Sequence, residues 1–261
     1  MAEFSAIEWT DATWNPVTGC TKVSPGCKFC YAERLTERFG QLRFSDIRLH
    51  PDRLDLPLRW KAPRRIFVNS MSDLFHENIP ARFINHVFDT MRSARQHVFQ
   101  VLTKRPDRLL EWQRSGTWPL DIPQNVWLGV SVESANYLWR VDRLREVEVQ
   151  IRFISAEPLL GSLTGLDLDG ISWVITGGES GGPPDRALID ITSRGYRPKP
   201  SAVAWVREIR DLCHERRVAF FHKQWGGRTA KSGGRRLDGR EWSEYPRAPT
   251  GLVTAPVKVP R

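Results

Sequence analysis

The chain has little cysteine, with only four residues among 261. So few thiols in a chain of this length do not form the dense disulfide framework of small secreted domains. The sequence also lacks any run of eighteen apolar residues, which excludes an ordinary membrane-spanning helix. Its first twelve residues, MAEFSAIEWTDA, have neither a basic start nor an apolar stretch and predict no signal peptide. We therefore expect a cytoplasmic protein with no membrane partner.

What the sequence does contain is an ordinary globular composition with an excess of positive charge. Hydrophobic residues make up 40% of the chain, and its length allows one large domain or two small ones. Because 39 Lys and Arg outnumber 30 Asp and Glu, the formal net charge is +9. Such a charge favours a polyanionic partner such as a nucleotide or a nucleic acid. Much of it lies in residues 226–240, where it is equally typical of a solvated loop.

Short apolar runs that end in polar residues recur along the chain and predict the strands of a sheet. Six of them begin at Arg65, His97, Val126, Ile151, Ser172 and Val218, with an earlier one near Ala12. The segments after Pro80 and Pro200 have helical periodicity. Strands that are apolar on both faces and alternate with helices indicate a parallel sheet. No run leads directly into G-x-G-x-x-G, which disfavours a dinucleotide-binding sheet.

We therefore predict an α/β fold, a single partial TIM-like βα barrel, over residues 1–225. Residues 226–261, rich in Gly, Arg and Pro, form a predicted C-terminal extension or lid. Ligand chemistry on such barrels lies at the carboxyl ends of the strands. Every predicted strand supplies polar residues or glycines there, namely Asn69, Ser70, Asp73, Thr103, Lys104, Arg105, Ser131, Glu133, Glu157, Gly177, Gly178, Glu179, His222, Lys223 and Gln224.

Three of the four cysteines lie within eleven residues, in the spacing Cys20-x6-Cys27-x2-Cys30. They follow the first predicted strand and so lie at the same edge. Pro25 and Gly26 favour a turn that returns the first thiol toward the C-x2-C pair. In a cytosolic chain, clustered thiols are more typical of metal ligands or catalytic groups than of disulfides.

Several kinds of site fit three such thiols. A structural zinc ion usually takes four ligands, and His50 or His76 would have to be the fourth, although neither has a familiar finger spacing. An iron–sulfur cluster held by three cysteines keeps one iron open to a small chelating molecule. Plain buried thiols are the third alternative. The remaining cysteine, Cys213, lies in a predicted helix and is expected in the core.

The stretch CKFCYAERL resembles the cluster-binding loop of radical S-adenosylmethionine enzymes. In those enzymes three cysteines bind a [4Fe-4S] cluster, an aromatic residue precedes the last cysteine, and a helix follows. Here the aromatic residue is Phe29 and the helix would begin near Tyr31. The usual first gap has three residues and this one has six, so the loop must bulge after Cys20.

The wider chain resembles a phage-associated family of three-cysteine-motif proteins of uncertain function. The shared motifs cover nearly the whole sequence: WNPVTGC, GCKFCYAE, FVNSMSDLFH, LTKRP, WLGVSVE, EPLLG, GGESG and KQWGG. This resemblance implies that Cys20, Cys27 and Cys30 bind the cluster and that its open iron binds S-adenosylmethionine. An external electron donor would then drive cleavage of the cofactor to a 5′-deoxyadenosyl radical.

The resemblance and the predicted strand order suggest partners for each part of that cofactor. We expect the ammonium group to meet Asn69, Ser70 and Asp73. Its carboxylate would meet Lys104 and Arg105, and its ribose Ser131 and Glu133. Gly177, Gly178 and Glu179 resemble the Gly-Gly-Glu motif of these enzymes, although they come late in the chain. We expect Glu179 to face the adenine or the substrate, Glu157 to bind a polar substrate, and Lys223 to close the barrel or cover the ligand.

The sequence thus favours an iron–sulfur enzyme of the radical S-adenosylmethionine type that acts on a nucleotide, a nucleic acid or a related anion. No catalytic residue is assigned. The alternative is a non-enzymatic nucleic-acid-binding protein with a structural zinc or iron–sulfur site. A hydrolase using Glu157 and Glu179 is a third hypothesis, but it leaves the cysteines unexplained.

Overall fold

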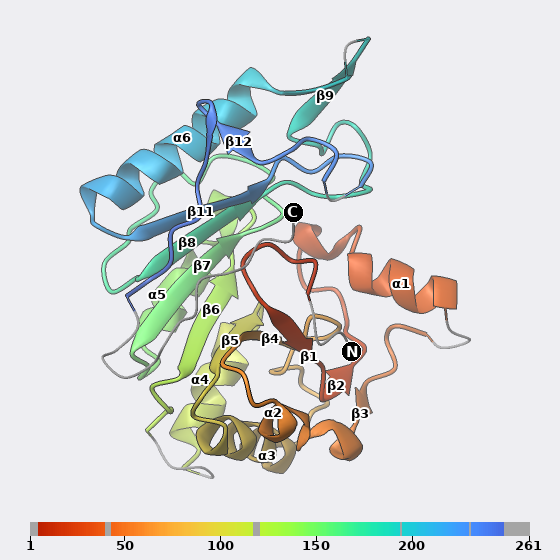
Figure 1. Cartoon of the computed structure of the whole chain (residues 1–261), viewed down its shortest axis with the longest axis vertical. Coiled ribbons are helices and arrows are strands. Elements are labelled where there is room, and N and C mark those ends of the chain that lie inside the picture. The colour runs from red at the N-terminus through yellow and green to blue at the C-terminus, as the bar shows by residue number, and fades with distance from the viewer. Residues whose placement is uncertain (1–4, 40–42, 117–120, 194, 230, 248–261) are drawn as a thin grey trace.

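The computed structural model describes residues 5–39, 43–116, 121–193, 195–229 and 231–247 (Figure 1). A seven-stranded parallel sheet runs through it, formed by β1 (Ala12–Trp14), β4 (Arg65–Val68), β5 (Val98–Thr103), β6 (Val126–Ser131), β7 (Ile151–Ala156), β8 (Trp173–Gly177) and β11 (Ala219–Gln224). Each strand pairs with the next one in this order, and β1 and β11 are the two edges. The sheet is therefore an open, partial barrel, which confirms the predicted fold.

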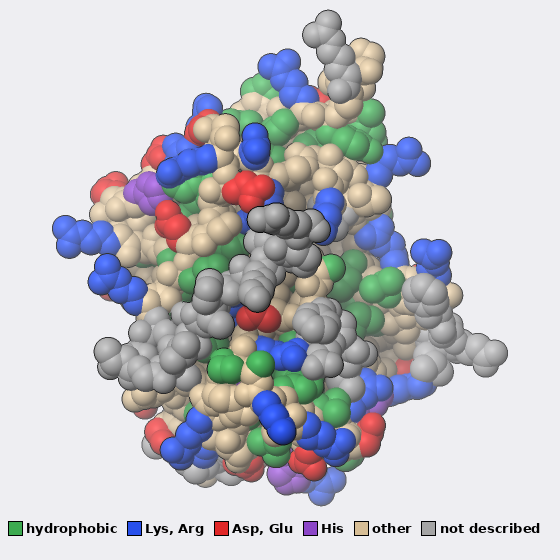
Figure 2. All heavy atoms as spheres, viewed as in Figure 1, with side chains coloured by type: hydrophobic (Ala, Val, Ile, Leu, Met, Phe, Trp, Pro, Cys, Tyr) green, Lys and Arg blue, Asp and Glu red, His purple; other side chains and the backbone are tan. Residues whose placement is uncertain are grey.

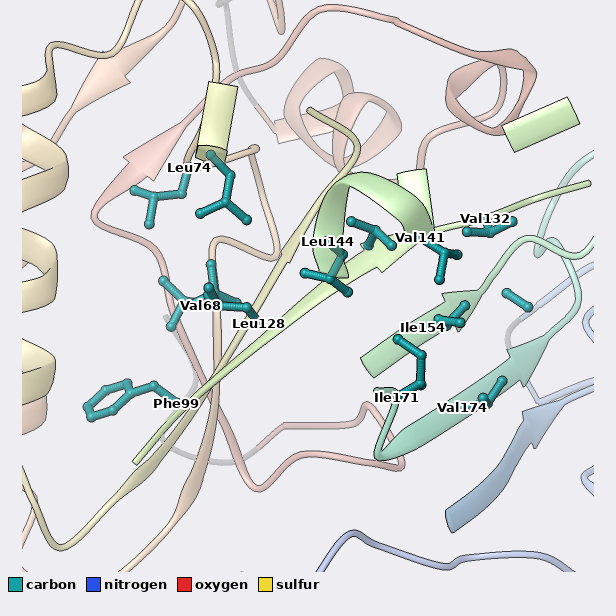
Figure 3. Packing of buried hydrophobic residues seen from close by; sticks show 14 of the residues in the cluster. Val68, Leu74, Phe99, Leu128, Val132, Val141, Leu144, Ile154, Ile171 and Val174 are labelled. Atoms are coloured by element: carbon teal, nitrogen blue, oxygen red, sulfur yellow. The ribbon is translucent and has the colours of Figure 1, made fainter. Parts of the chain in front are cut away.

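Helices connect most of the strands and cover one face of the sheet. They are α3 (Ala81–Ser93), α4 (Pro106–Arg114), α5 (Trp139–Arg145) and α6 (Pro200–Glu215). Their apolar residues recur at helical spacing, as in α6, where Ala202, Val206, Ile209 and Cys213 are buried. Figure 3 shows the same packing at α5, whose Val141 and Leu144 lie against the sheet. Cys213 is fully buried, as expected for a core residue.

A second, aromatic cluster fills the other face of the sheet near the amino ends of the strands. Trp173 is its centre, with ring contacts to Trp127 at 5.9 Å, Phe153 at 5.6 Å and Phe221 at 6.1 Å. Trp9, from the segment before β1, contacts Trp173 at 6.1 Å. Large rings of this kind bury much apolar area. They occupy the amino-end half of the barrel interior and leave the carboxyl-end half to polar residues.

The remaining elements are short. They are β2 (Val17–Thr18) paired with β3 (Arg48–Leu49), β9 (Ile189–Thr192) with β10 (Gly195–Pro198), β12 (Arg236–Leu237) with β13 (Arg240–Glu241), the helices α1 (Tyr31–Phe39) and α2 (Leu56–Arg59), and three 3-10 turns at Pro25–Cys27, Pro51–Arg53 and Ala135–Tyr137. None of the helices in the described ranges is both long and apolar enough to span a bilayer.

The described part of the predicted C-terminal extension packs on the sheet. Tyr245 lies 5.3 Å from the Trp173 ring, and the Trp173 indole donates a 2.9 Å hydrogen bond to the Glu244 carbonyl. Residues 248–261 of that extension lie outside the described residues. The boundary at residue 225 stays a prediction.

Gly129 in β6 gives a first test of this packing. A Cβ at this position would lie 2.5 Å from the Phe153 ring, whereas one at Gly161 would meet nothing closer than 3.8 Å. Overpacking a buried site commonly costs about 1–3 kcal/mol. We expect Gly129→Ala to lower the free energy of unfolding by that amount in urea, with Gly161→Ala close to wild type. Equal stability of the two variants would contradict the packing of Phe153 across β6.

His222 in β11 gives a second test, of pH dependence. Burial, aided by the nearby Arg235, lowers the pKa of His222 from 6.5 to about 3, and only its Nδ1 has a partner among the described residues, the Thr176 hydroxyl at 2.9 Å. Its stabilising contribution is therefore complete above pH 6.5 and is lost as the pH falls toward 3, because the unfolded chain takes up the proton first.

Between pH 7.5 and 5.5 we expect wild type to lose about 1 kcal/mol more unfolding free energy than His222→Gln. The exposed His86 of α3 supplies the control, since His86→Gln should keep the wild-type pH dependence. Identical pH profiles for all three proteins would show that His222 is not held neutral.

Candidate functional site

The three clustered cysteines lie on one loop, residues 20–30, which we call the cysteine loop. It connects β2 to α1, contains the 3-10 turn Pro25–Cys27, and ends where α1 begins at Tyr31. The turn and the helix start agree with the sequence predictions. All three thiols are free and half-buried.

On the side of β4 and β5, two hydrogen-bonded contacts hold this loop. The Tyr31 hydroxyl, at the start of α1, donates to the Ser70 carbonyl after β4 at 2.5 Å. Arg105, after β5, donates to the Thr21 hydroxyl at 2.7 Å and to the Thr21 carbonyl at 3.2 Å. Its guanidinium also pairs with Glu77 at 2.5 Å. Arg105, predicted to bind a cofactor carboxylate, thus donates to the loop and to Glu77 through its two terminal nitrogens, while its buried Nε has no partner among the described residues.

On the side of β6, a buried ion pair reaches the middle of the loop. Glu133 and Arg140 have side chains only 1% exposed, and their charged atoms lie 2.9 Å apart. The second carboxylate oxygen of Glu133 accepts a 3.3 Å hydrogen bond from the Gly26 backbone. A Cβ at Gly26 would lie 3.1 Å from that carboxyl carbon, so glycine permits the approach.

On the side of β8, a second ion pair also contacts the cysteine loop. Glu179 is 6% exposed and accepts two 2.8 Å hydrogen bonds from Arg186, which also donates to the Pro25 carbonyl at 2.9 Å. The Arg186 guanidinium lies 5.2 Å above the Phe29 ring. Arg34 of α1 donates to two carbonyls in the segment after β8, at Ser180 and Gly181. The cysteine loop therefore lies across the carboxyl ends of β4, β5, β6 and β8.

The Cys20 thiol lies in a partly buried position near Asp73 and Arg105. Burial raises its pKa to about 12, with Asp73 adding to this effect and Arg105 opposing it. Asp73 itself is 7% exposed and accepts hydrogen bonds from the Thr103 hydroxyl at 2.7 Å and the Lys104 backbone at 2.9 Å. Asp73 thereby joins the ends of β4 and β5 directly beneath the loop.

The barrel interior carries a second group of charges. Glu157, after β7, forms an ion pair with Lys223 of β11, and both side chains are mostly buried. Gly177 makes room for it, because a Cβ there would lie 3.2 Å from the Glu157 carboxyl carbon. Burial raises the pKa of Glu8, while the positive charge of Lys223 opposes the shift. Glu8, Glu157 and Lys223 thus interact electrostatically inside the barrel, on the face of the sheet opposite the helices.

Asn69 is a predicted site residue with an unused polar group next to the cysteine loop. It has a left-handed backbone, with φ of 60°, and its Oδ1 accepts a 3.3 Å hydrogen bond from the Val17 backbone. Its buried Nδ2 has no partner among the described residues. Strained residues with unsatisfied groups are concentrated at functional sites. Asn69 therefore presents a buried donor at the strand end beside the cysteine loop.

Other predicted site residues make hydrogen bonds or packing contacts within the fold, or line a different pocket. The Ser70 hydroxyl bonds the Asn15 side chain at 3.2 Å, and the Ser131 carbonyl accepts from Arg140 at 2.8 Å. Gly178 lets its backbone approach the Trp225 carbonyl more closely than any side chain would permit. Lys104 lines a separate pocket on the outer side of the cysteine loop. Their predicted contacts with a cofactor stay predictions.

The two histidines considered as a fourth zinc ligand each form a hydrogen bond with a threonine. His50 bonds the Thr18 hydroxyl at 2.8 Å and His76 bonds the Thr21 hydroxyl at 2.9 Å. Within the described ranges, no three His, Cys, Asp or Glu side chains are arranged to hold a single metal ion. A four-iron cluster makes a different demand, because it takes each thiolate on its own iron. The donor chemistry of three thiols on one braced loop, beside the unused Asn69 amide, fits such a cluster.

Sequence reasoning missed the basic partners in this site. Arg140, Arg186 and Arg34 brace the loop, and Glu8 approaches the Glu157–Lys223 pair from the segment before β1. They lie outside the strand ends on which the sequence prediction relied, although Arg140 and Arg186 each follow their glutamate by seven residues. A glutamate at a buried strand end is the one usable signal, because a buried carboxylate requires a cation.

The fold and the site together define an α/β half-barrel protein with a three-cysteine loop at its strand ends. The chain belongs to the family described as Protein of unknown function (DUF5131), whose model matches residues 4–246. That description gives neither an activity nor a phage association. No curated protein matches the sequence.

Several solved structures of spore photoproduct lyase are similar to the chain at low identity. One, a cysteine-to-serine mutant of that enzyme, has a TM-score of 0.47 and 13% identity, covering 85% of this chain and 79% of the other. Another, a double mutant with bound AdoMet and dinucleoside spore photoproduct, has a TM-score of 0.45 and 13% identity, covering 82% and 76%. Similarity at this level assigns no reaction to this chain.

The bracing of the loop makes a testable prediction. In Arg186→Met the buried Glu179 loses its partner and Pro25 loses a donor, which should cost about 2–4 kcal/mol of unfolding free energy. We also expect faster labelling of Cys27 by a thiol reagent under native conditions, because the adjoining turn loosens. Arg114→Met, which breaks an exposed pair with Glu146, is the matched control and should change neither quantity. Unchanged Cys27 labelling in Arg186→Met would contradict the bracing role.

Proposed function

We propose that this protein is an iron–sulfur enzyme of the radical S-adenosylmethionine type. The observation that carries the proposal is the position of the cysteine loop across the carboxyl ends of four parallel strands. Barrel enzymes place their chemistry at this edge. The stability of the fold alone requires neither three thiols at this edge nor two buried ion pairs that hold their loop.

In this proposal Cys20, Cys27 and Cys30 hold a [4Fe-4S] cluster, which leaves one iron for S-adenosylmethionine. When bound, the cluster and this cofactor supply the one-electron chemistry of the enzyme class. The chain's own task is to bind and orient. Glu133 with Arg140, and Glu179 with Arg186, fix the loop, so these two carboxylates act as positioning groups and not as direct ligands of the ribose or adenine.

The substrate side of the site is the barrel interior. Asn69 offers a buried amide donor beside the loop, and the Glu157–Lys223 pair offers an acceptor and a donor further in. Such a pair suits a polar ring with adjacent donor and acceptor atoms, as a nucleobase has. The net charge of +9 supports a nucleotide, a nucleic acid or a related anion as substrate. On the face in Figure 2, however, Lys and Arg are spread among Asp and Glu and form no single basic stripe.

The compartment follows from the same chemistry. All four cysteines are free, and free thiols persist where the environment is reducing. We therefore propose that the protein works in the cytoplasm with an external electron donor.

The decisive experiment uses protein purified without oxygen and reconstituted with iron and sulfide. We expect about four irons per chain and a reduced-cluster electron paramagnetic resonance signal that changes when S-adenosylmethionine is added. Cys20→Ala, Cys27→Ala and Cys30→Ala should each lose that signal, since each removes one ligand. Cys213→Ala is the matched control, because this thiol is buried in α6, and it should retain the full signal.

Two results would contradict the proposal. One zinc per chain with no bound iron would indicate the alternative, a structural metal site in a nucleic-acid-binding protein. A cluster whose signal is unaffected by S-adenosylmethionine would exclude an open iron that binds this cofactor.

A further inference from the structure

A pocket of about 370 Å³ opens on the outer side of the cysteine loop, apart from the barrel interior. Its walls come from Val23 of the loop, from Phe75 and Glu77 after β4, from residues 104–111 around the start of α4, and from residues 137–140 around the start of α5. This volume lies within the range of small-molecule sites and is large enough for one nucleotide. Of the residues predicted to bind the cofactor, it includes only Lys104 and Arg105.

The charges around the pocket are paired with one exception. Ion pairs join Arg105 to Glu77 at 2.5 Å, Arg108 to Glu111 at 3.5 Å, Asp107 to Arg143 at 3.0 Å and Arg140 to Glu133 at 2.9 Å. Among the lining residues, all of which the structure describes, Lys104 alone is a charged side chain without an ionic partner. Its ammonium is therefore free to meet an anionic group.

The start of α4 adds to this positive end of the pocket. The helix has nine residues, begins at Pro106, and has no side-chain cap at Arg105; the one acid in its first turn, Asp107, is paired with Arg143. Uncapped backbone N–H groups and the helix dipole both favour an anion at that position. A phosphate at Lys104 would thus also face the first turn of α4.

The opposite wall is aromatic and holds a second unused donor. Trp139 is 42% exposed, a large ring left open beside the pocket. Arg140 lies 4.4 Å from the Tyr137 ring centre and 5.7 Å from that of Trp139. It is 1% exposed, and its Nε has no hydrogen-bond partner in the described part of the chain. A nucleobase has the flat π-face that stacks on such a wall and the acceptors that an arginine can meet.

From these features we infer that the pocket binds a nucleotide, with its phosphate at Lys104 and the start of α4 and its base on Trp139. The nucleotide is either free or one unit of a single strand, since both present the same phosphate and base. The site lies outside the barrel and does not require the iron–sulfur cluster. It is thus a second binding site, and it would let a nucleic-acid substrate be held beside the cysteine loop while another unit enters the barrel.

The test measures binding of four probes to the full-length chain without iron: AMP, adenosine, S-adenosylmethionine and a fluorescent oligothymidylate. We expect AMP to bind at least about tenfold more tightly than adenosine, because only AMP carries the phosphate. Lys104→Ala and Trp139→Ala should each weaken binding of the oligonucleotide about tenfold. Lys104→Arg should restore it, and Lys104→Ala should reduce the salt dependence by about one phosphate contact.

The matched controls are Lys61→Ala, an exposed lysine before β4, and Tyr196→Ala, an exposed aromatic residue on β10. Both should bind as wild type does. An oligonucleotide that binds far more tightly than AMP identifies the single strand as the ligand, and equal affinities identify the free nucleotide.

Three outcomes would overturn the inference. They are no binding of AMP or oligonucleotide to wild type, unchanged binding in both pocket variants, or preferential binding of S-adenosylmethionine that depends on Lys104. The last would return Lys104 to the cofactor site. Because the measurement is made without iron, its failure is separate from a failure of the cluster experiment.

Discussion

The site depends on the charge neutralisation of two buried glutamates. Glu133 follows β6 and Glu179 follows β8, both at the carboxyl-end edge of the sheet. Each forms an ion pair with an arginine, Arg140 in one case and Arg186 in the other. An unpaired carboxylate so deeply buried would lower the stability of the fold. Each glutamate therefore requires its arginine, and the ion pair fixes the arginine in place. Both pairs then contact the backbone of the 3-10 turn that carries Cys27. The position of the thiols relative to the strands is therefore set by electrostatics.

Much of the fold could be predicted from the sequence because buried parallel strands have a strong signature. All seven strands, the helices after Pro80 and Pro200, and the start of α1 at Tyr31 follow from apolar runs, periodicity and the cysteine motif. The polar residues at the strand ends were also found, since each follows its strand directly. Periodicity therefore specifies the helix or strand to which a residue belongs and the edge of the sheet at which it lies.

The direction of each side chain, and its partner, could not be predicted in the same way. Glu179 and Glu133 look like ligand-binding residues in the sequence, yet each forms an ion pair with an arginine seven residues further along the chain. Lys104 follows its strand just as Asn69 does, but one lines an outer pocket and the other lies buried beside the loop. Such choices depend on the tertiary packing of loops between strands, for which a single sequence carries no periodic signal.

The aromatic cluster around Trp173 also joins segments that are far apart in the chain. Trp9 and Ile7 from one end of the fold and Tyr245 from the other pack together at the amino-end half of the barrel. Both segments cover rings of the same cluster, so loosening either one would expose apolar surface that the other also packs against. The two segments are therefore coupled in stability, although they lie far apart in the chain.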